Sequence, residues 1–214
     1  MAGAILAVDK PYGWTSTRVV EWVKRRFRVR KAGHAGTLDP LATGLVLVAV
    51  GEATRQIPTL QSWEKEYYAL LMLGYKTLSG DGEFPPQVVG QPPVLSPQAR
   101  REILAEWEGE IWQRPPAFSA LKIAGKRAYA LARQGKEVSL PPRKVVIYKI
   151  EEVFYHPQRW LLRVVAGKGV YIRSLAQDIG DRVGCGAYLG SLRRTRIGQF
   201  SVYGAHQPDA VAGR

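Results

Sequence analysis

The chain has 214 residues, with 31 Lys and Arg against 18 Asp and Glu and a formal net charge of +13 at pH 7. This length suits one large domain or two small ones, and the charge predicts a polyanionic partner. A single cysteine, Cys185, excludes an internal disulfide, and three scattered histidines do not form a zinc motif. The sequence offers no apolar run for a membrane span and no signal peptide, so we expect a cytoplasmic protein.

The N-terminal region combines a short strand with a basic helix. Residues 4–8 predict the strand, and Val19, Val23 and Phe27 at four-residue spacing predict an amphipathic helix that begins within residues 14–17. The helix and its exit carry seven cations against one acid, Glu21: Arg18, Lys24, Arg25, Arg26, Arg28, Arg30 and Lys31. Charge runs are most often solvated faces, but this excess favours contact with RNA or DNA.

The stretch 33–44 contains one carboxylate, Asp39, between glycine-rich turns. Asp39 followed by Pro40 fits a helix N-cap with proline at the first helical position and Gly44 beyond the end. Residues 45–50 predict a buried strand. In the alternative interpretation, Asp39 is held rigidly where the chain enters this strand, a position that suits a catalytic carboxylate. Residues 65–74 predict a further strand, in which Tyr67 and Tyr68 point to opposite faces.

The middle of the chain alternates between proline-rich and basic sequence. Residues 78–97 predict a loop, and Ser96 before Pro97 predicts the N-cap of a helix with Ala99, Ile103 and Trp107 on one face. Residues 111–150 hold nine Lys and Arg against one acid, Glu137. Within them, residues 115–138 show weak apolar periodicity, which predicts an exposed, mobile arm. In this arm, Phe118 and Tyr129 would stack on bases, and a short helix would span residues 129–133.

The C-terminal third predicts two strands, at 145–154 and 160–166, and a helix with Leu175, Ile179 and Val183 on one face. Gly184 ends this helix, and a last strand lies near 199–203. Strands outnumber helices and do not alternate strictly with them. We therefore expect an α+β fold with a mixed, largely antiparallel central sheet flanked by helices and loops.

The stretch 33–44 resembles the catalytic motif of the TruB family of RNA pseudouridine synthases, which isomerise uridine 55 in the T-loop of tRNA. Segments 8–16, 65–67, 119–122, 168–173 and 192–194 match further family motifs in the same order. The resemblance implies the pseudouridine synthase fold, one catalytic domain over residues 1–214, and isomerase activity without metal or cofactor. It also implies that the arm at about 115–138 acts as a thumb against the tRNA T-arm. We expect no C-terminal PUA domain.

The resemblance transfers roles to individual residues. Asp39 matches the essential aspartate, Tyr67 the tyrosine that stacks on the flipped uracil, and Arg173 the arginine paired with the catalytic carboxylate. Substrate contacts are expected from seven residues: His34, Tyr171, Leu192, Lys10, Lys122, Lys126 and Arg127. The loop 77–82 keeps only part of an acidic turn of the family, and we assign it no role.

Two alternatives stay open: a related synthase acting on another RNA, and a non-catalytic RNA-binding or RNA-folding module. A module that only binds has no need for Asp39, Tyr67 and Arg173 together. We expect a monomer without an obligate protein partner.

Overall fold

The structure is a computed structural model that describes residues 3–119, 122–123, 126–128, 134, 138 and 140–208. The chain forms two compact units. Unit 1 comprises Met1–Tyr68, Val164–Lys168 and Leu192–Arg214, and unit 2 comprises Ala69–Arg163 and Gly169–Ser191. Three strands, β4, β11 and β12, contribute residues to both units.

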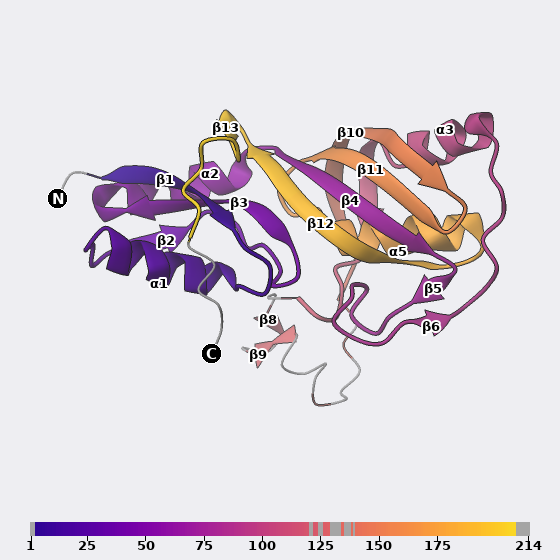
Figure 1. The fold of residues 1–214 in the computed structure, drawn as a ribbon, viewed down its shortest axis with the longest axis horizontal. Helices are drawn as coiled ribbons and strands as arrows, with labels where there is room; N and C mark the ends of the chain where they lie inside the picture. The colour runs from indigo at the N-terminus through magenta and orange to yellow at the C-terminus, as the bar shows by residue number, and fades with distance from the viewer. Residues whose placement is uncertain are drawn as a thin grey trace. The chain divides into compact units, whose positions relative to one another are not determined.

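Unit 1 is built on strands from the two ends of the chain (Figure 1). Its elements are β1 (Ala4–Lys10), α1 (Ser16–Arg26), β2 (Ala32–His34), β3 (Thr43–Val50), the 3-10 helix η1 (Gly51–Gln56), α2 (Ile57–Ser62), the start of β4 (Lys65–Leu73), the end of β11 (Arg159–Ala166), the end of β12 (Ala187–Ile197) and β13 (Phe200–Ser201).

Strand β3 is the centre of unit 1. On one side it pairs antiparallel with β1 along its whole length, and on the other it pairs antiparallel with β2 at its Val50 end. At its Thr43 end it pairs in parallel with β12, through Arg193 and Arg194. Residues 44–50 of β3 are all buried, because α1 packs against β2 and β3 and because Leu45 and Leu47 join a core cluster.

Helix α1 begins at a side-chain cap, as its sequence predicts. The Thr15 hydroxyl accepts a hydrogen bond from the Arg18 amide at 3.1 Å, which satisfies one free N–H of the first turn. Val19 and Val23 are fully buried. The apolar face of α1 therefore fixes the helix on the sheet and leaves its cations outward.

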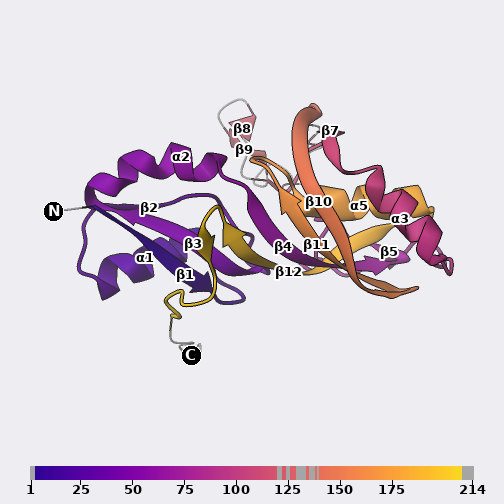
Figure 2. The same cartoon turned by 90° about the horizontal axis from the view of Figure 1, so that it is seen from above.

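Unit 2 contains the rest of the sheet, in the order β12-β4-β11-β10-β7. Its elements are the end of β4, β5 (Tyr75–Lys76), β6 (Gln87–Val88), α3 (Pro97–Ala105), β7 (Gly109–Gln113), β8 (Lys122–Ile123), β9 (Lys126–Arg127), β10 (Arg143–His156), the start of β11, α5 (Ile172–Val183) and the start of β12. Helices α3 and α5 pack against each other (Figure 2).

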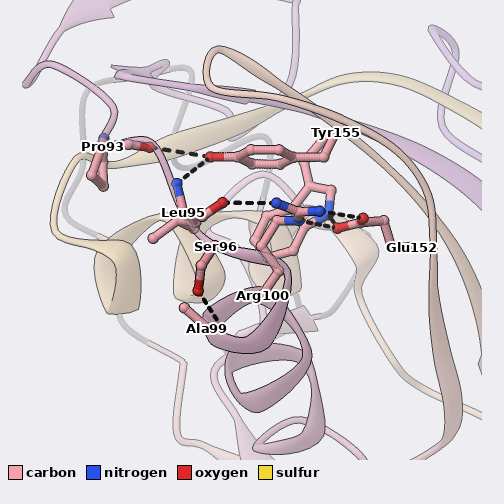
Figure 3. Close-up of polar contacts among 8 residues, drawn as sticks. Pro93, Leu95, Ser96, Ala99, Arg100, Glu152 and Tyr155 are labelled. Carbon is pink, nitrogen blue, oxygen red and sulfur yellow. Dashed lines mark hydrogen bonds and ion pairs between the residues drawn. The ribbon is translucent and has the colours of Figure 1, made fainter.

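A polar cluster anchors α3 to β10 (Figure 3). The Arg100 guanidinium donates to both carboxylate oxygens of Glu152, at 2.7 and 3.0 Å, and lies 4.2 Å from the Tyr155 ring centre. The Tyr155 hydroxyl accepts from the Leu95 amide and donates to the Pro93 carbonyl. These contacts fix the approach to α3, whose N-cap Ser96 was predicted from the sequence.

The predicted fold class is confirmed: the structure is α+β, with a mixed and mostly antiparallel sheet. The two longest strands that were not predicted are β7 and the 11-residue β12. The short strands β2, β5, β6, β8 and β9 were not predicted either, and β6 lies within the expected loop 78–97. The charged residues Arg193, Arg194 and Arg196 interrupt the apolar alternation of β12, and the burial of Arg194 at 1% exposure is invisible to a pattern search.

Candidate active site

The loop that carries Asp39 joins β2 to β3. Its first residue is fixed by a bond from the Ala35 amide to the Leu47 carbonyl, at 2.8 Å. A turn follows Asp39, in which the Ala42 amide donates to the Asp39 carbonyl at 3.1 Å, and β3 begins one residue later. No helix follows Pro40 in this part of the described chain, so the N-cap interpretation of Asp39 is wrong.

Both neighbours of Asp39 in the chain are held by residues 10–16. The Ser16 hydroxyl donates to the Leu38 carbonyl at 3.1 Å and accepts from the Leu38 amide at 2.8 Å. On the other side, the Pro40 carbonyl accepts from the Gly13 amide at 2.9 Å. The peptide units that flank the carboxylate are thus fixed by a distant segment of sequence.

Lys10 adds a third contact to this arrangement. Its side chain is fully buried, and the ammonium donates to the carbonyls of Trp14 at 2.7 Å and of Pro11 and Pro40 at 3.1 Å each. Burial lowers the pKa of Lys10 to about 8, attraction by Asp39 opposes this shift, and repulsion by Arg194 adds to it. Because the three ammonium protons are used on carbonyls, the geometry favours a positioning role over the RNA contact predicted for Lys10.

Arg194 holds the other end of the loop. Its guanidinium, on β12, donates to the carbonyls of Leu45 at 2.7 Å, Gly36 at 3.2 Å and Thr37 at 3.3 Å. Arg194 pairs with Gly44 across the two strands, and a Cβ at Gly44 would lie 2.2 Å from the Arg194 carbonyl oxygen. Gly44 also has φ +107, so glycine is required here on both counts. Sequence reasoning placed Arg194 in a motif but gave it no role.

Three other predicted residues lie in unit 1. Tyr67 is 8% exposed on β4, and Leu192 is buried on β12. Burial lowers the pKa of His34, and repulsion by Arg194 lowers it further, so both favour the neutral imidazole. Lys65 lies two residues before Tyr67, and burial lowers the pKa of its side chain to about 8. The Lys65 ammonium donates to the Gln61 and Trp63 carbonyls.

Arg173 lies in unit 2, at the start of α5, and is 4% exposed. Its guanidinium donates to the carbonyls of Ser79 at 2.9 Å and Phe118 at 2.8 Å, and its Nε lies 3.7 Å from a carboxylate oxygen of Asp81. Asp81 also accepts from the Ser79 hydroxyl at 2.5 Å and the Glu83 amide at 3.1 Å. The pairing of Arg173 with Asp39 stays a prediction.

This cluster revises two expectations. The loop 77–82 was assigned no role, yet its Asp81 is buried against Arg173. Phe118 was expected to be an exposed stacking residue, and this is wrong. Phe118 is 9% exposed as a residue, and its ring packs on Phe84, with 5.3 Å between ring centres. Packing on Phe84 accounts for the burial of the ring, and the bond from Arg173 to the Phe118 carbonyl fixes the backbone.

Tyr171, the predicted wall of the base pocket, is the N-cap of α5. The Gln113 amide group fixes its backbone from both sides, accepting from the Tyr171 N–H at 2.7 Å and donating to the Tyr171 carbonyl at 3.1 Å. The Arg143 guanidinium lies 5.2 Å from the centre of the Tyr171 ring. The phenol is therefore carried on a rigid backbone, as a residue that shapes a pocket requires.

The three remaining cations lie on two short strands. Lys122 of β8 pairs with Arg127 of β9, and Lys126 lies beside Arg127. Residues 120–121, 124–125, 129–133, 135–137 and 139 lie outside the described part of the chain. The helix expected at 129–133 and the stacking of Tyr129 therefore also lie outside it, and the mobile arm stays a prediction.

Among the described residues, no group of three or more His, Cys, Asp and Glu side chains could hold a metal ion. Within the same residues, no helix is long and apolar enough to cross a membrane.

Comparison with known proteins decides the family. Residues 24–172 match the model of the TruB family pseudouridylate synthase N-terminal domain, and residues 173–212 match the tRNA pseudouridylate synthase B C-terminal domain. The chain belongs to the TruB family. The resemblance of its motifs is thereby confirmed, and with it the expected enzyme class, an isomerase of the pseudouridine synthase type.

The relatives are proteins named tRNA pseudouridine synthase B. The protein of Bordetella avium is 43% identical over 97% of this chain and 86% of its own length, and that of Bacteroides fragilis is 45% identical over 94% and 88%. The protein of Methylobacillus flagellatus is 44% identical, and the match covers 94% of this chain and 66% of that protein.

A solved structure titled as a Cbf5-Nop10-Gar1 complex matches with a TM-score of 0.70 and 36% identity. The match covers 92% of this chain and 49% of that chain. A structure titled pseudouridylate synthase matches at 16% identity with a TM-score of 0.51, which supports the fold alone.

Proposed function

We propose that this chain converts uridine 55 in the T-loop of tRNA to pseudouridine, with Asp39 as the essential carboxylate. The observation that carries the proposal is the fixation of Asp39 from both sides, through Leu38 and Pro40, in a chain of the TruB family. A carboxylate that must meet one atom of a nucleoside gains from such rigidity, because a misplacement of about 1 Å can cost about 100-fold in rate.

The reaction is an isomerisation of the substrate's own base. The C1′–N1 bond breaks, the base turns, and a C1′–C5 bond forms. The hydrogen on C5 is lost to solvent, and N1 gains a proton. Asp39 would act at the nucleoside as the glycosidic bond breaks. Atoms and electrons balance within the nucleotide and water, so the chemistry requires no cofactor.

Tyr67 and Arg173 would complete the site. The uridine must leave the T-loop stack before its C1′–N1 bond can be reached, at a cost of about a few kcal/mol. Stacking on the Tyr67 ring would return about 1–3 kcal/mol. Arg173 is oriented by Asp81, Ser79 and Phe118, which would hold its guanidinium ready to pair with Asp39.

The alternatives differ in what they require of the site. A non-catalytic RNA module would bind through the basic surfaces, and rigid support for one carboxylate would serve no purpose in it.

We further propose that the chain works alone on tRNA, as a cytoplasmic monomer. Activity of the purified chain, together with its sedimentation as one species, tests this. Nop10 and Gar1 are components of the solved complex, and we do not propose them as partners of this chain.

The test of the function is Asp39→Asn. The substitution keeps the size of the side chain and removes the carboxylate, so we expect no tritium release from a tRNA transcript that contains 5-tritiated uridine. Binding of the transcript should stay within about threefold, because basic surfaces supply most of the affinity. Sequencing then locates the modified position in the wild-type reaction.

The matched control is Asp181→Asn, which removes a half-exposed carboxylate whose partner is Lys76. It should react at the wild-type rate. Turnover by Asp39→Asn at a tenth of the wild-type rate or more would contradict the role of Asp39. Modification at another uridine would instead contradict the assignment of position 55.

A further inference from the structure

A compact run of positive charge lies in unit 1, outside the site. We define the basic segment as residues 24–31, which hold six cations and no acid: Lys24, Arg25, Arg26, Arg28, Arg30 and Lys31. All except Lys24 are exposed. Across the residues that the structure describes, none of the six forms an ion pair with an acidic side chain.

The backbone at Arg28 distinguishes this segment from an ordinary solvated face. Arg28 has φ 53, and it is the one non-glycine residue with positive φ in the described chain. It follows the C-cap Phe27 of α1, and the Val29 amide donates to the Lys24 carbonyl at 3.1 Å, which closes a Schellman-type helix end. Glycine is favoured at this position, since a side chain in the left-handed region is strained. An arginine in this strained position is a backbone outlier from which a functional hypothesis can start.

Favourable interaction with the helix dipole explains only some of the cations in the basic segment. Lys24, Arg25 and Arg26 lie in the last turn of α1, where cations stabilise the negative end of the helix. This effect decays within one turn. Arg28, Arg30 and Lys31 lie beyond the helix, and in the described part of the chain they pair with no acid, so neither the helix dipole nor an ion pair accounts for them.

The C-terminal end of the segment is far from the loop of Asp39. The Lys31 carbonyl accepts from the Gly51 amide at 2.9 Å, and Ala32 pairs with Val50, so the segment ends at the Val50 end of β3. The loop of Asp39 enters β3 at its other end, at Thr43. Seven residue steps at about 3.3 Å each separate the two ends by about 23 Å. The C-terminal end of the segment is therefore too far from the loop of Asp39 to contact a uridine held at that carboxylate.

We propose that the basic segment binds the phosphate backbone of the substrate tRNA outside the T-arm. The inference rests on the proposed function, which supplies a folded RNA that extends well beyond the target loop. Exposed guanidinium and ammonium groups in this number, without acidic partners among the described residues, suit sequence-independent phosphate contact. The segment adds affinity for the whole tRNA and leaves the choice of uridine to the site of Asp39.

Arg28→Gly is the decisive variant, because it should raise the stability of the protein and lower its affinity for tRNA. Removing strain should raise Tm by about 2–4 °C. Removing one phosphate contact should weaken binding of a whole tRNA transcript about three- to tenfold near 0.1 M salt and flatten the slope of log K against log[salt] by about 0.7–0.9. Binding of an isolated T-arm stem-loop should not change. Arg28→Lys keeps the charge and should keep the wild-type slope.

Arg159→Ala is the charge-matched control. It removes an exposed cation at the start of β11 in unit 2, and it should leave both slopes unchanged. An unchanged slope for whole tRNA in Arg28→Gly would overturn the proposal, and so would an equally weakened binding of the stem-loop. Tritium release from the stem-loop by the wild-type protein reports the proposed function separately, because it does not involve the phosphate contact tested with Arg28.

Discussion

Replacing Arg194 by lysine should loosen the catalytic loop while keeping the charge. The guanidinium of Arg194 spans three carbonyls, on Gly36, Thr37 and Leu45, from one buried position. A lysine ammonium is a single point on a flexible stem and cannot reach acceptors that are spread across a planar fork. We expect it to keep the shortest contact, at Leu45, and to release the loop carbonyls.

The magnitude follows from the hydrogen bonds that the substitution removes. A hydrogen bond to a charged group contributes about 1.5–3 kcal/mol net, and the two bonds to Gly36 and Thr37 are long, at 3.2 and 3.3 Å. We therefore expect a decrease of about 2–4 kcal/mol in the free energy of unfolding, and a fall in Tm of about 5–15 °C. If the released loop moves Asp39 by about 1 Å, the chemical step should slow by about 10–100-fold.

The assay is single-turnover tritium release with saturating enzyme, at a temperature where circular dichroism shows the variant to be folded. The dissociation constant for tRNA should stay within about twofold, because Arg194 is buried. Arg196→Lys, an exposed position on the same strand, is the control and should behave as wild type. A folded Arg194→Lys protein that reacts within twofold of the wild-type rate would refute the reasoning.

Four further expectations concern other groups. The pKa of Lys10 is about 8 in the folded protein and 10.5 when unfolded, so the unfolded state binds more protons between these values. The free energy of unfolding of wild type minus that of Lys10→Met should therefore rise over pH 8–10.5, by at most about 1.4 kcal/mol per unit, and a falling difference in urea titrations would contradict this. Asp81→Asn should slow single-turnover tritium release at least about tenfold, because Arg173 is then without the charge that orients it, and an unchanged rate would exclude such a role. Lys126→Ala with Arg127→Ala should flatten the salt slope for a T-arm stem-loop by about one unit for each phosphate contact that the substitutions remove, and equal hydrogen exchange with and without RNA would count against a closing arm. Activity on that stem-loop should survive exhaustive chelation, and a chelated enzyme that regains activity only with zinc would contradict a metal-free reaction.

Sequence patterns predicted the elements whose formation depends on nearby residues. Thr15 and Ser96 cap α1 and α3 as their positions suggest, and Gly184 ends α5 in the left-handed conformation. The continuous apolar run 45–50 predicted a buried strand, because a strand that is covered on both faces needs no alternation of apolar and polar residues. These features depend on a few adjacent side chains, so they can be predicted from short stretches of sequence.

The features that were missed depend on contacts between distant segments. Asp81 is a turn residue by composition, and only its distance to Arg173, 92 positions away, makes it part of a buried ion pair. Phe118 shows no periodicity because its burial comes from Phe84 and not from a helix or strand of its own. Charged residues are expected to be exposed by default, so Lys10 and Arg194 were not expected inside the protein.

The family motifs correspond to packing units, and this explains why segments so far apart in the chain occur together. Segments 8–16 and 192–194 hold the loop 33–44 through Lys10, Ser16 and Arg194, so a change in either segment is transmitted to Asp39. Segment 168–173 belongs instead with the loop 77–82, through the contact of Arg173 with Asp81. Substitutions within the first group should lower the rate of the chemical step more than they weaken tRNA binding, since its anchoring atoms are buried. The basic surfaces should show the opposite balance, because their charges face solvent and contribute to encounter and affinity.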